Sequence, residues 1–392
     1  MFHIEKLPDD CLSSIFESIT NLDDLIVCSK VCQRWRFLIV QRLNKVKYLS
    51  DDSSIGCFKN SIYFNKLDSL SQSQLLGLLP RFKILDIRPT NETKFKSIDI
   101  FKVIEGIKSV KGLIYEPCWD KFHVRYQVLT MNLEMIATNL FEPSFIDCNQ
   151  NQLKLKQLYF ADCFQNHFEE IANSGYLKNL QRLHIGSRNF SISSYDGPVL
   201  ESIKILEACL YSYDATNPYP GFHFMDLCPS VESAHHLIKP KKLSINQTIK
   251  NNSLRNLVLD HPENYVSDNW TDLRNLLIKY PKLKNLAIRG DYGLDDSNLT
   301  ELLDLIPEIV ILDLRQSTRL SEKSKDIVNR YCQRKNREIW FYNRPDQRIE
   351  HDWPELASQT NQRICQGFDF MRNCFLKTFQ QLPYLIDPIE DD

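Results

Sequence analysis

The chain has 392 residues, of which 43% are hydrophobic and 25% are charged, a composition typical of globular proteins. Its length exceeds the roughly 250–300 residues at which one hydrophobic core stops growing, so we expect two unequal units or a small unit attached to a repeat array. The formal net charge of −2 leaves no basic excess to hold a phosphate backbone, which argues against nucleic-acid binding. The 11 glycines form no phosphate-binding loop, which argues against a nucleotide site.

The N-terminus has no basic stretch followed by an apolar core, and no uncharged apolar run reaches the ~18 residues that cross a bilayer. We therefore expect a protein of the cytoplasm, the nucleus or both, with no membrane contact. The 12 cysteines are scattered and include no CxxC pair, so in a reducing compartment they should stay free thiols. The sequence predicts no metal and no cofactor.

The opening residues 1–48 carry two helical patterns separated by a polar break at residues 20–21. The first pattern places four apolar residues on one helical face, at spacings of three and four: Leu12, Ile15, Phe16 and Ile19. The second pattern runs from Leu25 to Ile39. Three short helices of about 40 residues make a poor independent core. Such a unit either docks onto a partner or caps the repeats, and the periodicity alone leaves both readings open.

The same stretch resembles the F-box motif, which begins with Leu-Pro-Asp/Glu, continues with an Ile-Phe pair and ends in Val-Cys-x-x-Trp. The matching residues are Leu7, Pro8, Asp9, Leu12, Ile15, Phe16, Leu25, Val31, Cys32 and Trp35. The resemblance implies an F-box that binds a Skp-type adaptor and, through it, the cullin of an SCF-type ubiquitin ligase. It also implies an adaptor-binding surface of six residues: Leu7, Pro8, Leu12, Ile15, Val31 and Cys32. We expect Trp35 to pack inside the unit.

A segment of the form apolar-x-x-apolar-x-apolar returns throughout residues 49–343. It begins at Phe82, Val110, Leu155, Leu180, Leu200, Leu254, Leu283 and Ile309, with a weaker copy at Val231. Helical patterns lie between the copies, for example over residues 270–281 and 297–307, and proline ends several of them. Four of the spacings, from Leu155 to Leu180, Val231 to Leu254, Leu254 to Leu283 and Leu283 to Ile309, are 25, 23, 29 and 26 residues and resemble the leucine-rich repeat. The predicted fold is therefore α/β: a small helical F-box followed by a solenoid, or horseshoe, of parallel strands.

Two stretches fit this repeat poorly. Val110 to Leu155 spans 45 residues, which requires either a degenerate repeat near residues 129–139 or a protruding loop. After a last strand from Arg337, residues 344–392 contain a helical pattern over 355–382 and an acidic end. We expect this C-terminal part to be a helical cap over the last repeat, with a peptide-like binding element as the alternative.

Residues between the core-facing positions of each strand should point into the concave wall of the solenoid. The predicted wall residues are Asp86, Arg88, Tyr159, His184, Lys204, Asp260, Arg289, Asp313, Arg315, Trp340 and Tyr342. Arginine and aromatic side chains are enriched at interface hot spots, although most charges on a repeat surface contribute little. The candidate target-binding residues are Arg88, Asp260, Arg289, Arg315, Trp340 and Tyr342. A one-residue shift in strand register would bury Trp340 instead.

The sequence contains no HExxH, GxSxG or Walker motif, so it predicts no catalytic residues. His235 and His236 are adjacent on an expected strand and should face opposite sides, which argues against a metal site. The predicted function is that of a non-catalytic adaptor: the F-box holds the chain on an SCF ubiquitin ligase while the repeats hold an unidentified protein substrate. The main alternative is a non-degradative leucine-rich-repeat scaffold, and a hydrolase on a repeat frame ranks third.

Overall fold

The computed structural model describes residues 4–50, 60–64, 77–86, 110–115, 133–139, 155–212, 216–261, 270–290, 293–349, 352 and 370–386. The chain divides into two compact units, Met1–Leu155 and Lys156–Asp392. The first therefore contains both the helical N-terminus and the beginning of the repeats. Among the described residues, no helix combines the length and the hydropathy that a membrane-spanning segment requires.

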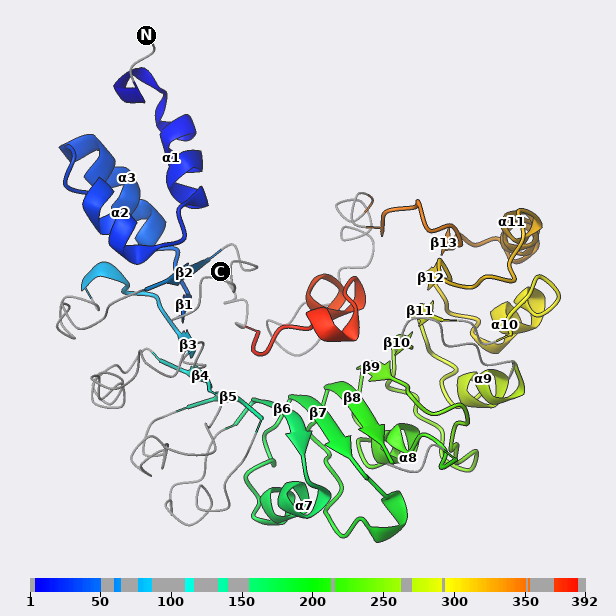
Figure 1. Cartoon of the computed structure of the whole chain (residues 1–392). Helices are drawn as coiled ribbons and strands as arrows, with labels where there is room; N and C mark the ends of the chain where they lie inside the picture. The colour runs from blue at the N-terminus through cyan, green and yellow to red at the C-terminus, as the bar shows by residue number, and fades with distance from the viewer. Residues whose placement is uncertain are drawn as a thin grey trace. The chain divides into compact units, whose positions relative to one another are not determined.

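The first unit begins with a short 3₁₀ turn, Ile4–Lys6, and three helices: α1 (Asp9–Ser18), α2 (Leu22–Cys28) and α3 (Gln33–Leu43) (Figure 1). The polar break predicted between the first two helices is confirmed, because the Asn21 side chain accepts a hydrogen bond of 2.8 Å from the Asp23 amide and caps α2. Apolar residues from all three helices are buried together: Leu12, Phe16, Leu22, Leu25, Leu38, Ile39 and Leu43.

Five parallel strands complete this unit: β1 (Tyr48–Ser50), β2 (Ser61–Tyr63), β3 (Ile84–Asp86), β4 (Gly112–Ile114) and β5 (Met135–Thr138), in the order β2-β1-β3-β4-β5. The helices are tied to β2, because Arg42 of α3 donates a 3.2 Å hydrogen bond to the Ser61 carbonyl. Strand β5 falls within residues 129–139. A degenerate repeat, one of the two readings of the long interval after Val110, is thus confirmed.

In the second unit eight parallel strands follow one another in chain order: β6 (Gln157–Cys163), β7 (Arg182–Arg188), β8 (Ile205–Tyr211), β9 (Ser233–Leu237), β10 (Asn256–Asp260), β11 (Asn285–Arg289), β12 (Ile311–Asp313) and β13 (Trp340–Tyr342). Five helices lie along one side of this sheet: α7 (Gln165–Asn173), α8 (Gly221–Asp226), α9 (Trp270–Leu277), α10 (Leu299–Leu305) and α11 (Lys323–Lys335) (Figure 1). This arrangement confirms the predicted α/β solenoid of parallel strands.

The alternation of side chains along each strand gives the sheet two faces. One set of alternate residues, which includes Leu257, Leu286 and Leu312 in neighbouring register positions, is fully buried on the side of the helices. The other set faces away from the helices and forms the concave wall. The repeat of roughly 25 residues therefore aligns one leucine per turn of the solenoid and stacks a continuous core.

The predicted phase of one repeat, that is, the residue at which its apolar motif starts, is wrong. Leu183 of β7 pairs with Leu206 of β8, so the apolar motif of this repeat starts at Ile203, three residues after the predicted Leu200. As a result Glu207, not Lys204, lies on the concave wall, and the Lys204 ammonium instead pairs with Glu232 at 2.9 Å. The sequence allows both phases, because Leu200, Ile203 and Leu206 are all apolar and three residues apart.

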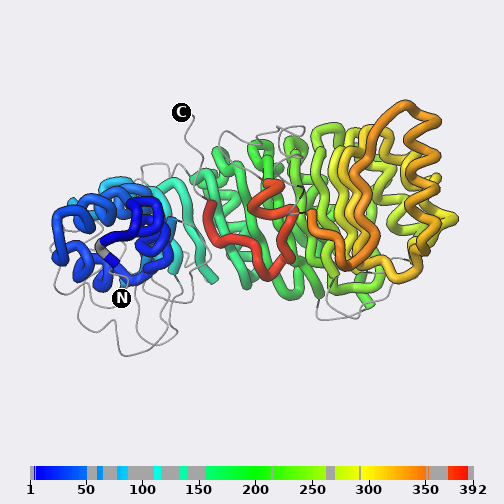
Figure 2. The backbone as a smooth tube through the Cα atoms, turned by 90° about the horizontal axis from the view of Figure 1, so that it is seen from above, coloured from blue at the N-terminus to red at the C-terminus, as the bar shows by residue number. Residues whose placement is uncertain are grey.

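Residues 370–386, called the tail segment below, lie on the concave side, opposite the helices (Figures 1 and 2). The helix predicted over 355–382 is not continuous there: the tail segment has a π-helical turn, Met371–Phe375, a 3₁₀ turn, Phe379–Gln381, and no regular secondary structure over its last five residues. The expected cap over the last repeat is corrected for this part of the chain, which covers the wall. Residues 353–369 lie outside the described part.

Candidate functional site

Large apolar side chains are exposed on the three-helix region of the first unit. Among the described residues, nine large hydrophobic side chains are exposed, and six of them fall within residues 4–44: Ile4, Ile15, Val27, Val31, Phe37 and Val40. Phe37 and Val40 are three residues apart on α3 and so share one side of that helix. Since an isolated domain gains nothing from exposing such side chains, their concentration marks an interaction surface.

The residues predicted to face an adaptor do not all reach this surface. Ile15, Val31 and Cys32 are exposed, as is Pro8, whereas Leu7 is half-buried. Leu12 is fully buried between the helices and cannot contact a partner there, so its assignment to the adaptor surface is corrected to the core. Helical periodicity predicts that Leu12 and Ile15 share one side of α1. In the structure Leu12 is buried, whereas Ile15 is exposed.

Arg34 holds the start of α1 against α3. Its guanidinium donates to the Leu7 carbonyl at 2.6 Å and forms an ion pair of 2.6 Å with Asp9. The Cys32 sulfur accepts a hydrogen bond from the Trp35 amide at 3.5 Å and so caps α3. Trp35 itself is half-buried and meets the Phe16 ring edge-on, with 5.2 Å between ring centres. These contacts fix the Leu-Pro start and the Val-Cys-x-x-Trp end relative to each other.

The concave wall of the second unit is covered by the tail segment (Figure 2). Apolar side chains of the wall and of the tail segment form one buried cluster, to which the wall contributes Ile205, Cys209, Leu237, Val258, Ala287, Ile311 and Tyr342. The tail segment contributes Phe370, Met371, Cys374, Phe375, Phe379, Leu382 and Ile386. This cluster is separate from the core beneath the helices, since it uses the alternate strand residues.

Polar side chains of the wall bind the backbone of the tail segment. The Gln157 amide both donates to the Ile386 carbonyl at 2.5 Å and accepts from the Ile386 N–H at 3.0 Å. Arg182 donates to the carbonyls of Pro383, at 2.6 Å, and Tyr384, at 3.1 Å. These hydrogen bonds involve main-chain groups of the tail segment, so they do not depend on the identity of its side chains.

A buried charge network lies in the middle of the wall. Glu207 receives hydrogen bonds from Arg182, the shortest of 2.8 Å, and from His184 Nδ1 at 2.9 Å. Burial alone would raise the pKa of Glu207, but Arg182 and His184 outweigh burial and lower this pKa to about 2. The Cys374 thiol of the tail segment donates to the same carboxylate at 3.1 Å. Burial and the nearby Glu207 raise the pKa of Cys374, which therefore stays a neutral donor.

Asp260 and Arg289, both predicted target-binding residues, contact the tail segment instead of solvent. The Asp260 carboxylate accepts a 2.8 Å hydrogen bond from the Phe379 N–H. Arg289 donates to the carbonyls of Phe375, at 2.5 Å, and Lys377. Both residues are only 5% exposed. They do lie on the concave wall, as predicted, but the chain itself occupies them.

The remaining predicted target residues have different positions. Trp340 and Tyr342 lie on the wall side of β13, because Trp340 pairs with Ile311 and Tyr342 with Asp313. The alternative register, which would have buried Trp340 beneath the helices, is excluded. Trp340 packs half-buried against the wall cluster, while Tyr342 is buried and donates to Asp352 at 2.8 Å. Arg88 lies outside the described residues.

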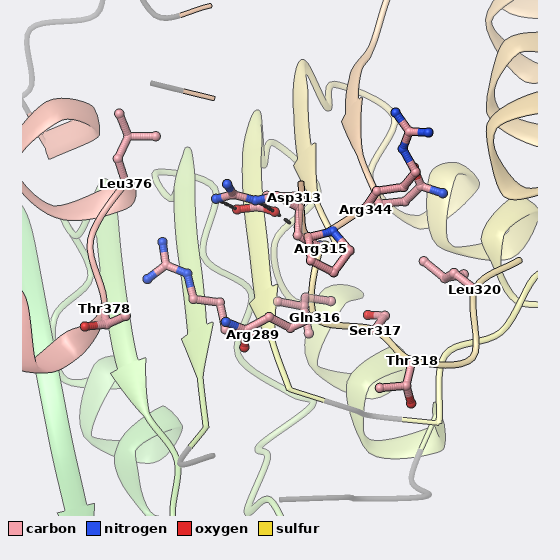
Figure 3. Close-up of a pocket in the computed structure, with 13 residues that line it drawn as sticks. Arg289, Asp313, Arg315, Gln316, Ser317, Thr318, Leu320, Arg344, Leu376 and Thr378 are labelled. Carbon is pink, nitrogen blue, oxygen red and sulfur yellow. Dashed lines mark hydrogen bonds and ion pairs between the residues drawn. The ribbon is translucent and has the colours of Figure 1, made fainter. Parts of the chain in front are cut away.

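A cavity of about 670 Å³ remains open at the C-terminal end of the wall (Figure 3). Its described lining comes from the carboxyl ends of β11 and β12, from residues that follow β12 and β13, and from the tail segment: Ile288, Arg289, Asp313, Arg315, Gln316, Ser317, Thr318, Leu320, Asn343, Arg344, Pro345, Leu376 and Thr378. The volume falls within the range of about 300–1,000 Å³ of ligand pockets. The lining has three arginines and one carboxylate, so the cavity is predominantly cationic.

The arginines of the cavity are held to different degrees. Arg315 forms two hydrogen bonds with the Asp313 carboxylate, of 2.8 and 2.9 Å, and donates to the Gln347 carbonyl at 3.0 Å. Arg344 is half-exposed and pairs with the more exposed Asp346 at 3.5 Å, a contact that water screens. Arg315 is therefore a fixed donor, whereas Arg344 can turn toward a ligand.

A metal centre has no support in the described ranges, where no group of three or more histidine, cysteine or acidic side chains has a suitable arrangement. His235 and His236 point to opposite faces of β9, as alternation predicts. His235 lies 3.5 Å from Asp260 on the wall. On the helix side, His236 Nδ1 and the Tyr219 hydroxyl form a hydrogen bond of 3.0 Å. Burial lowers the pKa of both histidines.

Sequence reasoning missed the residues that bind the tail segment most closely: Gln157, Arg182 and Glu207. Glu207 was hidden by the phase error in β8. Gln157 and Arg182 each lie directly before the second apolar residue of their motif. The wall therefore includes one more residue at the start of each of these strands than the sequence predicted. The position equivalent to Arg182 holds Asn256 in β10 and Asn285 in β11, and these polar residues are the signal that could have placed this position on the wall.

Comparison with known protein families identifies the N-terminal three-helix region. Residues 4–44 match the family model described as F-box-like. The match covers the three helices and all six exposed apolar side chains described above, and it agrees with the Leu-Pro start and the Val-Cys-x-x-Trp end. The chain therefore carries an F-box-like domain at residues 4–44, followed by a solenoid of parallel strands.

Proposed function

We propose that this protein is the substrate-recognition subunit of an SCF-type ubiquitin ligase. In this function the F-box-like domain binds a Skp-type adaptor and, through it, a cullin, while the solenoid binds a protein target for ubiquitination. The chain itself performs no chemistry. It raises the effective concentration of the target near the transferring enzyme. It acts in the cytoplasm, the nucleus or both.

The observation that carries this proposal is the exposed apolar surface of the F-box-like domain. Val31 is 57% exposed and Phe37 is 62% exposed, although neither is needed to fill the core between the helices. A cap that only closed a repeat array would bury such side chains against its neighbour. Helical segments with exposed apolar faces are typical of docking surfaces, and F-box domains in general dock on Skp-type adaptors.

We place the target site at the open cavity of the solenoid. Three arginines, two amides and three hydroxyl side chains line it, so it can take a ligand group with several acceptor atoms. Of the candidate residues named from sequence, Arg289 and Arg315 reach this cavity. Asp260 and Tyr342 do not line it, and Trp340 packs beside the wall cluster.

Affinity capture followed by mass spectrometry tests the proposal, with three full-length chains compared: unaltered, Val31→Asp and Val199→Asp. Val199 is 54% exposed and lies in the second unit, so it provides a matched change of equal chemistry. We expect the unaltered chain and Val199→Asp to recover a Skp-type adaptor and a cullin, and Val31→Asp to lose both. Proteins that all three chains recover nominate the target.

Two results would contradict the proposal. Recovery of no adaptor by any chain would favour the non-degradative scaffold, in which the helices have another partner. Equal recovery by all three chains would show that the adaptor binds elsewhere than on the exposed apolar surface.

A further inference from the structure

The tail segment contacts the wall in the way a bound peptide does. It adds no strand: among the described residues, β6–β13 hydrogen-bond to one another, and the tail segment contains only two single turns. Its carbonyls and N–H groups are held by side chains of the wall, namely Gln157, Arg182, Asp260 and Arg289. Hydrogen bonds to main-chain groups, together with buried apolar anchors such as Phe375 and Phe379, are contacts of the kind that hold a peptide in a groove.

The repeats have a complete core without the tail segment. Leu257, Leu286 and Leu312 are fully buried on the helix side, where Leu273 of α9 and Leu302 of α10 are also fully buried. The tail segment packs only on the opposite face of the same strands. Its departure would expose that face and leave the core between strands and helices intact.

The covered face also carries charges that a permanent interior rarely has. Arg182, Glu207, Asp260 and Arg289 are each at most 5% exposed. A buried ion pair is often no more stabilising than well-packed apolar side chains of the same volume, because desolvation offsets the attraction. On a face that is sometimes open to water, the same charges are solvated when it is open and bind backbone groups when it is filled. This composition favours an exchangeable occupant.

We propose that the concave face of β6–β12 is a recognition groove for an apolar peptide, that the tail segment occupies it in cis, and that a matching segment of a protein target competes with the tail segment. Only the identity of the competitor as a ligase target rests on the proposed function. The groove itself stands on the contacts described above.

The tail segment defines the chemistry of that competitor. Its buried anchors Phe375, Phe379, Leu382 and Ile386 are separated by four, three and four residues. A small hydrogen-bond donor is favoured beside Glu207, where the tail segment has Cys374. The tail segment carries Arg372 and Lys377 and no acidic residue, so a peptide of low or positive charge fits best.

Fluorescence anisotropy with a labelled synthetic peptide of residues 370–386 tests the groove in the full-length chain. The double variant Phe375→Asp/Phe379→Asp places two charges where the tail segment is buried and should release it. We expect the peptide to bind this variant at least about tenfold more tightly than the unaltered chain, because the unaltered groove is open for only a small fraction of the time. Arg289→Met in the same double variant should weaken peptide binding.

Matched controls separate this result from general disruption. Gln380 is exposed beside Phe379, so Gln380→Asp should leave peptide affinity at the level of the unaltered chain. A peptide with Phe375→Ala and Phe379→Ala should not bind. Hydrogen exchange of the double variant should show lost protection in the tail segment and full protection in β6–β13.

Two outcomes overturn the proposal. If β6–β13 also lose protection, the tail segment is an integral part of the fold. If they keep protection but the peptide does not bind, the groove is not a peptide site. Titration of the same variant with a Skp-type adaptor distinguishes the proposals: binding of adaptor without peptide refutes the groove alone, whereas binding of peptide without adaptor refutes the ligase function alone.

Discussion

Glu207 shows how one side chain links the wall to the tail segment. It accepts hydrogen bonds from Arg182 and His184 of the wall and from Cys374 of the tail segment. Each of these donors forms a stronger hydrogen bond to the ionised carboxylate than to the neutral carboxyl group. The stability that this residue provides therefore depends on its charge, and its depressed pKa sets the pH range in which the charge is lost.

We predict that Glu207→Gln destabilises the protein at neutral pH and that the difference from the unaltered chain shrinks in acid. The folded-state pKa of about 2 lies below the ordinary value of 4.5, so the contribution is complete above pH 4.5 and is lost as the pH falls toward 2. Denaturant unfolding of both chains between pH 7 and pH 3 measures this difference. A difference that stays constant over that range would show that the Glu207 charge is not what stabilises the fold.

Leu12 and Val31 separate folding from docking within the F-box-like domain. Leu12 is fully buried, so Leu12→Ala should lower the free energy of unfolding of this domain by about 2–5 kcal/mol. Val31 is exposed, so Val31→Ala should change stability by less than about 0.5 kcal/mol. Thermal unfolding of the two variants measures both values. Equal losses would contradict the division of the two residues between core and surface.

At the scale of single elements, the repeats were predictable wherever an apolar period was unique. The motifs at Leu254, Leu283 and Ile309 and the helical patterns between them correspond to β10, β11, β12, α9 and α10, because each strand turns every second residue toward the helices and each helix buries one apolar stripe. The phase of β8 failed where three equally spaced apolar residues fit two registers. Local pattern decides an element only when one register buries more apolar surface than the other.

The tail segment could not be predicted from local pattern. Its apolar spacing of three and four indicates a helix, and the structure instead has two short turns followed by residues without regular secondary structure. The carbonyls of Phe375 and Lys377 accept hydrogen bonds from Arg289, some 90 residues earlier in the sequence. Pro383 also cannot continue a helix. Such contacts between distant side chains and backbone groups leave no periodic signal in the sequence. The sequence therefore did not predict that the tail segment covers the wall.

Strand β13 carries a prediction at this scale. Trp340 lies on the wall side of the strand and not in the core beneath α10 and α11. Trp340→Ala should therefore leave amide protection of β11, β12 and β13 intact in hydrogen exchange. Loss of protection across these strands would place Trp340 in the core and contradict the register. As a comparison, Leu312→Ala removes a core side chain and should reduce protection in the same strands.

For the whole molecule, the proposed function assigns two binding activities to two compact units. In this proposal, docking depends on exposed apolar side chains of residues 4–44, and target binding depends on the wall of the second unit, with its cavity and its covered groove. The formal charge of −2 offers little long-range attraction, so both interactions should depend on a few desolvated contacts. Changes to one surface should then leave binding at the other unchanged.

Titration calorimetry of the purified full-length chain with a purified Skp-type adaptor tests the central claim most directly. We expect saturable one-to-one binding, with a negative heat-capacity change because apolar surface is buried. Val31→Asp should weaken the affinity by at least about tenfold, which corresponds to about 1.4 kcal/mol, while Val199→Asp should leave it unchanged. Absence of binding by the unaltered, folded chain would contradict the account.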